Sequence, residues 1–190
     1  RNSDADWMGR TAAAIGAPII VPSTVFGQNA PSNRLTMGQI GVGNMGTTNM
    51  KEFLKRDDVQ VLAICDLDDA RAAEGKKTVV ETYAKKAPSG TYVGCDLIHD
   101  FRELIGRDDL DFISIAVPDH WHAIPAITAA NARKDIYAEK PLALTIRQGR
   151  AMCDAVARNK VIWQTGSWQR SEKHFHDACE LVRNGRIGKV

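Results

Sequence analysis

Short apolar runs alternate with helical patterns from Leu35 onward, and this alternation restricts the fold more than any other feature. The runs with the composition of buried strands are Leu35–Gly41, Val59–Cys65, Phe112–Val117, Ile136–Ala138 and Val161–Thr165. A further weak strand is expected around Val93. The segments with helical spacing or helix stop signals are Asp69–Ala87, His122–Ala132, Thr145–Asn159 and Glu172–Asn184. Alternation of this kind predicts an α/β fold, a Rossmann-type doubly wound parallel sheet with right-handed crossovers.

Composition excludes several classes of protein. The 190 residues are 44% hydrophobic and 25% charged, with 25 Lys and Arg against 23 Asp and Glu. No basic run or basic-aromatic stripe stands out, so nucleic acid is not an expected partner. The four cysteines, Cys65, Cys95, Cys153 and Cys179, have no CxxC spacing. We therefore expect free core thiols, with a disulfide as the alternative, and no metal site.

The N-terminal segment differs from the rest of the chain. Residues 11–28 are small and apolar, carry no charge and follow Arg10. This pattern predicts an export signal and hence a periplasmic location; the alternative is a disordered or docked arm on a cytoplasmic protein. The segment is too short and too rich in proline to predict a membrane span. We divide the chain into residues 1–33 (signal or arm), 34–166 (dinucleotide-binding domain) and 167–190 (start of a truncated substrate domain).

A glycine-rich turn follows the first predicted strand and opens the next helix. It reads GVGNMG, from Gly41 to Gly46, and is a GxGxxG motif. Gly41 would allow the tight turn, Gly43 the approach of a pyrophosphate, and Gly46 the packing of helix against strand. The helix N-terminus would then offer free amides to the phosphates. The turn predicts a dinucleotide site.

An acidic residue, Asp66, follows the second predicted strand. A carboxylate at this position of the fingerprint accepts hydrogen bonds from the adenosine ribose and repels a 2′-phosphate. Leu67 and Asp68 come next in place of arginine, so NAD is favoured over NADP. The alternative is that Asp66 caps a helix or belongs to a turn.

Two further segments end strands at the same predicted sheet edge. The first holds His120 and His122, for which no third metal ligand is placed, so no metal is expected. The second holds Lys140, which precedes Pro141. An ammonium there is placed to hydrogen-bond a substrate oxygen and to stabilise alkoxide charge. The alternative is a solvated surface lysine.

Together these segments resemble the Gfo/Idh/MocA family of oxidoreductases (glucose–fructose oxidoreductase, inositol dehydrogenase). GVGNMG, AVPDHWHA, YAEKPLALT and WQRS occur in the family's order, and the likeness spans residues 33–190. The N-terminal IIVPSTVFGQNAPSNR resembles exported members, although it lacks their twin arginines. The resemblance implies that NAD lies along the following residues: Gly41, Gly43, Asn44, Met45 and Gly46 at the pyrophosphate, Asp66 at the ribose, Val117, Pro118 and His122 along the cofactor, and Glu139, Pro141, Gln169 and Arg170 near the nicotinamide.

The same resemblance implies an activity. Lys140 would contact the substrate, and a secondary alcohol of a sugar, polyol or inositol would transfer hydride to the nicotinamide. Family members draw further catalytic groups from a second domain, for which this chain has no counterpart, so it should bind NAD and turn over little. The full-length protein is expected to be a homo-oligomer. One alternative is an NAD-dependent glycosidase of the same family, in which the counterpart of the Glu139-Lys140-Pro141 (EKP) motif typically differs. Another is a non-catalytic dinucleotide-binding module.

Overall fold

The structure is a computed structural model that describes residues 33–87 and 89–189. The segment with the expected export signal lies outside the described residues, apart from its last residue. Six strands form one sheet in the order β3-β2-β1-β4-β5-β6, and every neighbouring pair is parallel. The strands are β1 (Leu35–Ile40), β2 (Val59–Cys65), β3 (Asp96–Ile98), β4 (Phe112–Ile115), β5 (Asp135–Glu139) and β6 (Trp163–Gly166). This arrangement confirms the Rossmann-type sheet.

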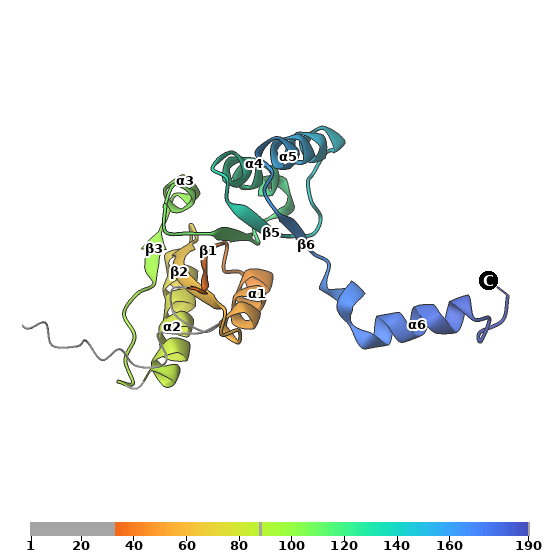
Figure 1. Ribbon diagram of the computed structural model, residues 1–190, viewed down its shortest axis with the longest axis horizontal. Coiled ribbons are helices and arrows are strands. Elements are labelled where there is room, and N and C mark those ends of the chain that lie inside the picture. Colours follow the sequence, from red (N-terminus) through yellow and green to blue (C-terminus); the bar gives the residue numbers. More distant parts are fainter. Residues whose placement is uncertain (1–32, 88, 190) are drawn as a thin grey trace, which may run out of the picture.

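Helices cover the two faces of the sheet (Figure 1). One face carries α1 (Asn44–Leu54) and α2 (Asp69–Lys86), and the other carries α3 (Phe101–Ile105), α4 (Ala123–Asn131) and α5 (Ile146–Asn159). Each face has its own core. Met50, Val79 and Tyr83 pack beneath the first pair of helices, and the alanines of α4 with Met152 pack beneath the second group. Two short 3₁₀ helices, η3 (Asp119–Trp121) and η4 (Trp168–Ser171), follow β4 and β6.

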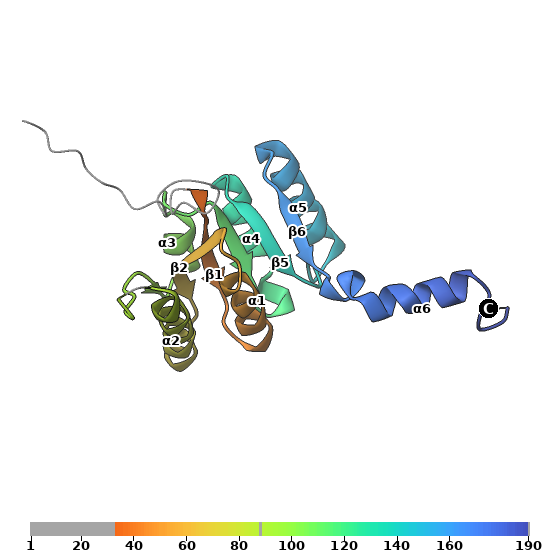
Figure 2. The same ribbon diagram turned by 60° about the horizontal axis from the view of Figure 1, so that its bottom comes forward.

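The last helix, α6 (Lys173–Arg183), points away from the sheet in both views (Figures 1 and 2). None of its side chains is buried, and Phe175 and Leu181 of its apolar positions are 39% and 50% exposed. The helix confirms the expected Glu172–Asn184 segment. The assignment of residues 167–190 to a separate domain stays a prediction. None of the described helices is long and apolar enough to cross a membrane.

One expected strand is wrong, and one short helix was not expected. Val93 is 97% exposed and lies in a loop, and the edge strand begins instead at Asp96, whose carboxylate pairs with Arg107 at 2.6 Å. The sequence patterns also miss α3, because its five residues are too few to show helical periodicity. Asp100 caps this helix by accepting a hydrogen bond from the Arg102 amide.

The cysteines are free in the structure, but only half of them are core residues. Cys65 and Cys95 are buried, and burial raises the pKa of their thiols to about 12 and about 11. Cys153 and Cys179 are exposed, which contradicts the expectation of four core thiols. Cys153 faces solvent because Met152 and Ala155 occupy the buried side of α5.

Two glycine-to-alanine substitutions in helices are predicted to have opposite effects on stability. A Cβ at Gly46 in α1 would lie 2.0 Å from the Gly41 carbonyl oxygen, which is backbone and has little freedom to move. A Cβ at Gly149 in α5 would meet nothing within 4 Å. We expect Gly149→Ala to raise the free energy of unfolding by about 0.5–1 kcal/mol. We expect Gly46→Ala to lower it by about 1–3 kcal/mol.

Urea denaturation of both variants beside the wild type measures these changes. Because each variant adds one methyl group to a helix, general helix propensity is matched between them. Equal stabilisation by the two substitutions would contradict the close packing of α1 on the end of β1.

Candidate functional site

The carboxyl ends of β1, β2, β4 and β5 meet at one edge of the sheet, and the motif residues follow directly from them. Gly41 follows β1, Asp66 follows β2, Val117 lies just beyond β4, and Lys140 follows β5. β1 and β4 are neighbours, so the chain order of the strands reverses between them. Ligands of open α/β sheets bind at this reversal, outside the strand ends.

Gly41 and Gly46 allow an unusually close approach between β1, β4 and α1. Gly41 has a φ of +82°, and a Cβ there would lie 2.3 Å from the Ala116 carbonyl oxygen. A Cβ at Gly46 would lie 2.0 Å from the carbonyl oxygen of Gly41 itself. Both positions therefore require glycine. The packing leaves the N-terminus of α1 at the strand end, where Gly43 caps the helix without a side-chain hydrogen bond.

Asp66 lies beside this turn. Its Oδ2 accepts a hydrogen bond from the Val42 amide at 2.8 Å, and its Oδ1 accepts one from the Asp68 amide at 2.9 Å. The capping residue of α2 is Asp68, which accepts from the amides of Ala70 and Arg71. Asp66 is therefore not a helix cap. It is a turn residue whose half-buried carboxylate is tied to the glycine turn.

Two depressions adjoin the turn. The first, here called the ribose cleft, is lined by residues at the ends of β1, β2 and β4 with their following loops, among them Gly41, Gly43, Cys65, Asp66, Arg71, Phe101, Val117, Pro118 and Trp121. The second, here called the phosphate hollow, is lined by Val42, Gly43, Asn44, Thr47, Thr48 and Arg71. Gly43 and Arg71 belong to both. Six of the predicted cofactor residues thus line one or both of these depressions.

His122 lies underneath this edge and not on its surface. Its side chain is only 1% exposed, and Nε2 lies 2.8 Å from the Val117 carbonyl oxygen. Nδ1 makes a short hydrogen bond with the carbonyl oxygen of Pro141. The ring therefore joins the loop after β4 to the loop after β5. In this structure it supports two predicted cofactor segments through their backbones.

Glu139 is also buried, with 4% exposure. Its Oε1 accepts a hydrogen bond from Asn49 Nδ2 at 2.8 Å, and its Oε2 accepts one from the Lys140 amide at 3.2 Å. A Cβ at Gly166 would lie 2.7 Å from Oε1, so β6 approaches the carboxylate closely. Burial and the charge of Glu139 raise the pKa of Tyr137. The carboxylate connects α1, the end of β5 and the end of β6.

Lys140 itself is exposed, as is Pro141, and the peptide bond between them is cis. No described hydrogen bond or ion pair uses the Lys140 ammonium, so it is available to a ligand. Gln169 and Arg170 lie on η4 beyond β6, are exposed, and line neither the ribose cleft nor the phosphate hollow. Their predicted contact with the nicotinamide side stays a prediction.

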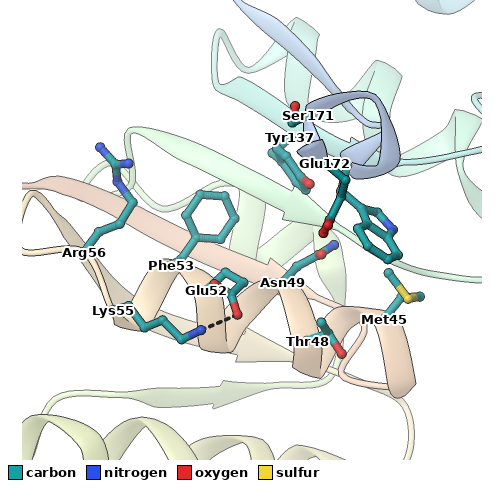
Figure 3. A pocket seen from close by; sticks show the side chains of 11 residues that line it. Met45, Thr48, Asn49, Glu52, Phe53, Lys55, Arg56, Tyr137, Ser171 and Glu172 are labelled. Atoms are coloured by element: carbon teal, nitrogen blue, oxygen red, sulfur yellow. Dashed lines mark hydrogen bonds and ion pairs between the residues drawn. The ribbon is translucent and has the colours of Figure 1, made fainter. Parts of the chain in front are cut away.

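Met45 does not line the phosphate hollow, although it was expected at the pyrophosphate. It lines a third depression, the α1 groove, with Phe53, Tyr137, Trp168, Glu172 and neighbouring residues. Figure 3 shows side chains of α1 facing Tyr137 of β5 and Ser171 of η4 across this groove. Asn49 lines the groove as well and reaches from it to the Glu139 carboxylate. The α1 groove and the phosphate hollow thus lie next to each other along α1, and Thr48 lines both.

The geometry fits a dinucleotide. The nearest atom to a Cβ built at Gly43 is Arg71 Nη1 at 4.0 Å, so the space before this glycine is open. The bare backbone and the uncapped first turn of α1 present amides to that space, as a diphosphate requires. The Asp66 carboxylate lies one strand away, where its predicted contact with the ribose stays a prediction. Among residues 33–87 and 89–189, no group of three His, Cys, Asp or Glu side chains could hold a metal ion.

Sequence reasoning missed three residues of this region: Asn49, Gly166 and Arg71. Asn49 had a usable signal, because it is a polar residue at helical spacing from Gly46 and next to Met50, both buried in α1. Gly166 and Arg71 had none, since their importance comes from which segments the fold brings together.

Comparisons with known proteins agree with this geometry. Residues 35–167 match the family described as "Oxidoreductase family, NAD-binding Rossmann fold" (GFO_IDH_MocA). "Glycosyl hydrolase family 109 protein 1" of Shewanella sp. (strain ANA-3) is 30% identical over 187 residues, which is 96% of this chain and 39% of the relative. "Alpha-N-acetylgalactosaminidase" of Shewanella oneidensis is 31% identical over 88% of this chain and 36% of its own length. The chain thus spans well under half of these relatives.

Solved structures show the same fold. The scyllo-inositol dehydrogenase from Lactobacillus casei with bound NAD(H) and scyllo-inositol aligns with a TM-score of 0.66 and 23% identity, over 82% of this chain and 43% of that protein. At this identity the likeness concerns the fold alone. The family match covers most of the chain and includes the glycine turn, Asp66 and the Glu139–Pro141 segment. The chain belongs to the Gfo/Idh/MocA family of oxidoreductases and contains its NAD-binding Rossmann fold.

Proposed function

We propose that the protein binds NAD and oxidises a secondary alcohol of a sugar, polyol or inositol. The observation that carries this proposal is the placement of three residues at one sheet edge: Gly43 with its open backbone, Asp66 with its carboxylate, and the exposed Lys140. A pure dinucleotide sensor needs the first two groups and has no use for the third.

Binding of the cofactor is assigned to the glycine turn and its surroundings. The first-turn amides of α1 would hold the diphosphate, with Asn44 at the rim of the phosphate hollow. Asp66 would hold the adenosine ribose, and its charge would oppose a 2′-phosphate, which favours NAD over NADP. Val117 and Pro118 would line the path toward the nicotinamide from the ribose cleft.

Lys140 is assigned to the reacting oxygen. When bound, the nicotinamide accepts the hydride that leaves the substrate carbon. The Lys140 ammonium would donate a hydrogen bond to the alcohol oxygen and stabilise the negative charge that grows there. Glu139, His122 and Asn49 would hold the backbone on either side of Lys140 in place, because their hydrogen bonds fix the loops after β4 and β5.

A second candidate is an NAD-dependent glycosidase that oxidises and later re-reduces its sugar. The relatives at 30% and 31% identity, which carry the names of glycosyl hydrolase family 109 and of an α-N-acetylgalactosaminidase, favour it. The first step would be the same hydride transfer, but Lys140 argues against this candidate, because the counterpart of the Glu139–Pro141 segment typically differs in the family's glycosidases.

Product stoichiometry separates the two candidates. With a panel of inositols, polyols and sugars, the dehydrogenase predicts one NADH formed for each substrate molecule oxidised. The NADH is measured by its absorbance in reactions with the full-length protein. With p-nitrophenyl α-N-acetylgalactosaminide and NAD, it predicts no release of nitrophenol. Release of nitrophenol without net NADH would overturn the dehydrogenase and establish the glycosidase.

Asp66→Asn is predicted to weaken NAD binding by about ten- to hundredfold, because a charged acceptor for the ribose is lost. The asparagine oxygen can still accept from the Val42 amide, so the turn should persist. Affinity for NADP should change less, since repulsion of the 2′-phosphate is also removed. Isothermal titration calorimetry with both cofactors measures these changes.

The matched control is Asp69→Asn, which removes the same charge from a side chain that is 87% exposed in the first turn of α2. We expect it to leave NAD affinity within twofold. Unchanged NAD affinity in Asp66→Asn, with thermal unfolding like that of the wild type, would refute the ribose assignment.

Lys140→Ala in the full-length protein is predicted to lower kcat by about 10²–10³-fold, a typical loss for one donor to a developing oxyanion. NAD affinity should stay within twofold, because the ammonium is assigned to the substrate oxygen and not to the cofactor. Steady-state kinetics and calorimetry measure the two quantities, with the exposed Lys77→Ala as control. Normal turnover of Lys140→Ala would remove this lysine from the mechanism.

A further inference from the structure

We propose that Arg71 binds the diphosphate of the dinucleotide and supplies the positive charge of that site. The inference rests on the proposed function. It adds a residue that is neither part of the glycine motif nor the acid proposed to bind the ribose. Arg71 would act as a ligand of the cofactor's phosphates and would contribute nothing to the choice between NAD and NADP.

The position of Arg71 is fixed by the start of α2. Asp68 caps this helix by accepting hydrogen bonds from the Ala70 and Arg71 amides, both at 3.0 Å. This cap places Arg71 in the first turn, next to the end of β2. From there the side chain reaches across to the glycine turn, where Nη1 lies 4.0 Å from a Cβ built at Gly43. The guanidinium thus borders the open space before Gly43.

Arg71 also connects the two depressions expected to hold the cofactor. It lines the ribose cleft with Asp66 and Gly43, and the phosphate hollow with Gly43 and Asn44. A dinucleotide that spans both depressions would pass its diphosphate between them. Arg71 is the single cationic side chain among the residues that line the phosphate hollow.

The guanidinium is available for a ligand. Its closest described acid is Asp68, with Nε 3.7 Å from Oδ2, and the two side chains are 62% and 50% exposed. No hydrogen bond of the Arg71 side chain occurs in the described part of the chain. By contrast, Arg102 at the other side of the ribose cleft donates to both carboxylate oxygens of Asp100 and lies over the Phe101 ring. The Arg102 guanidinium therefore already has an acidic and an aromatic partner.

Charge explains why the site needs this residue. The diphosphate group carries a charge of about −2, and in the proposed site it would lie next to the carboxylates of Asp66 and Asp68. The N-terminus of α1 offers only about half a positive charge. A guanidinium offsets the remaining repulsion, and its planar set of donors matches two phosphate oxygens at once.

The test is calorimetry of NAD and NADP binding to the wild type, Arg71→Ala and Arg71→Lys. We expect Arg71→Ala to weaken NAD and NADP by the same factor, about ten- to hundredfold. Arg71→Lys should recover part of the loss, because it keeps the charge without the planar fork. The salt dependence of NAD affinity should be shallower in Arg71→Ala than in the wild type, since one phosphate contact is missing. The matched control is Arg150→Ala, an exposed helical arginine on α5, which should stay within twofold.

The outcomes separate this proposal from the proposed function. If the wild type binds NAD and Asp66→Asn weakens it while Arg71→Ala does not, the cofactor assignment stands and the Arg71 proposal fails. Loss of NADP affinity alone would assign Arg71 to the 2′-phosphate and overturn the proposal. Loss of NAD affinity with an unchanged salt dependence would place Arg71 against an uncharged part of the cofactor, which also overturns it. A wild type that binds neither cofactor refutes both.

Discussion

The contact between the backbones of α1 and β1 determines the geometry of the whole site. With no side chain at Gly46, α1 packs directly on the Gly41 carbonyl, and Gly41 in turn packs on the carbonyl of Ala116. This brings the amide end of α1 to the point where the strand order reverses. It also places the Val42 amide against the Asp66 carboxylate, so the positions proposed for the phosphates and the ribose depend on the same contact.

A second set of contacts holds the other half of the edge. His122 joins the carbonyls of Val117 and Pro141, and Asn49 carries a hydrogen bond from α1 to Glu139. The helix that would bind the diphosphate is thereby connected to the loop that carries the proposed substrate contact. Two of the predicted cofactor residues, His122 and Glu139, thus also hold the loops at this sheet edge together. Hydrogen bonds between buried polar groups favour one defined position for such a loop.

The sequence was sufficient for the features that depend on local pattern. The long helices, five of the six strands and the glycine turn follow from hydrophobic periodicity and from glycine spacing, which act over a few residues. It was insufficient where tertiary contacts decide. β3 is placed by its parallel pairing with β2 and lies beyond the exposed Val93, and Gly166 matters only because β6 meets Glu139. Arg71 has no local signal either, since its place beside Gly43 requires α2 to pack next to α1.

Because hydride removal from a secondary alcohol begins both a dehydrogenation and a redox-dependent glycoside cleavage, one sheet edge is suited to either. The glycine turn, Asp66 and Lys140 would act before the two reactions diverge. After that step the new carbonyl acidifies the neighbouring C–H bond, and a base placed there would start the loss of a leaving group. The difference would then depend on groups around the sugar ring and also on the Glu139–Pro141 segment, whose counterpart typically differs in the glycosidases. This explains how relatives named as glycosyl hydrolases share sequence with this chain while inositol dehydrogenases share its fold.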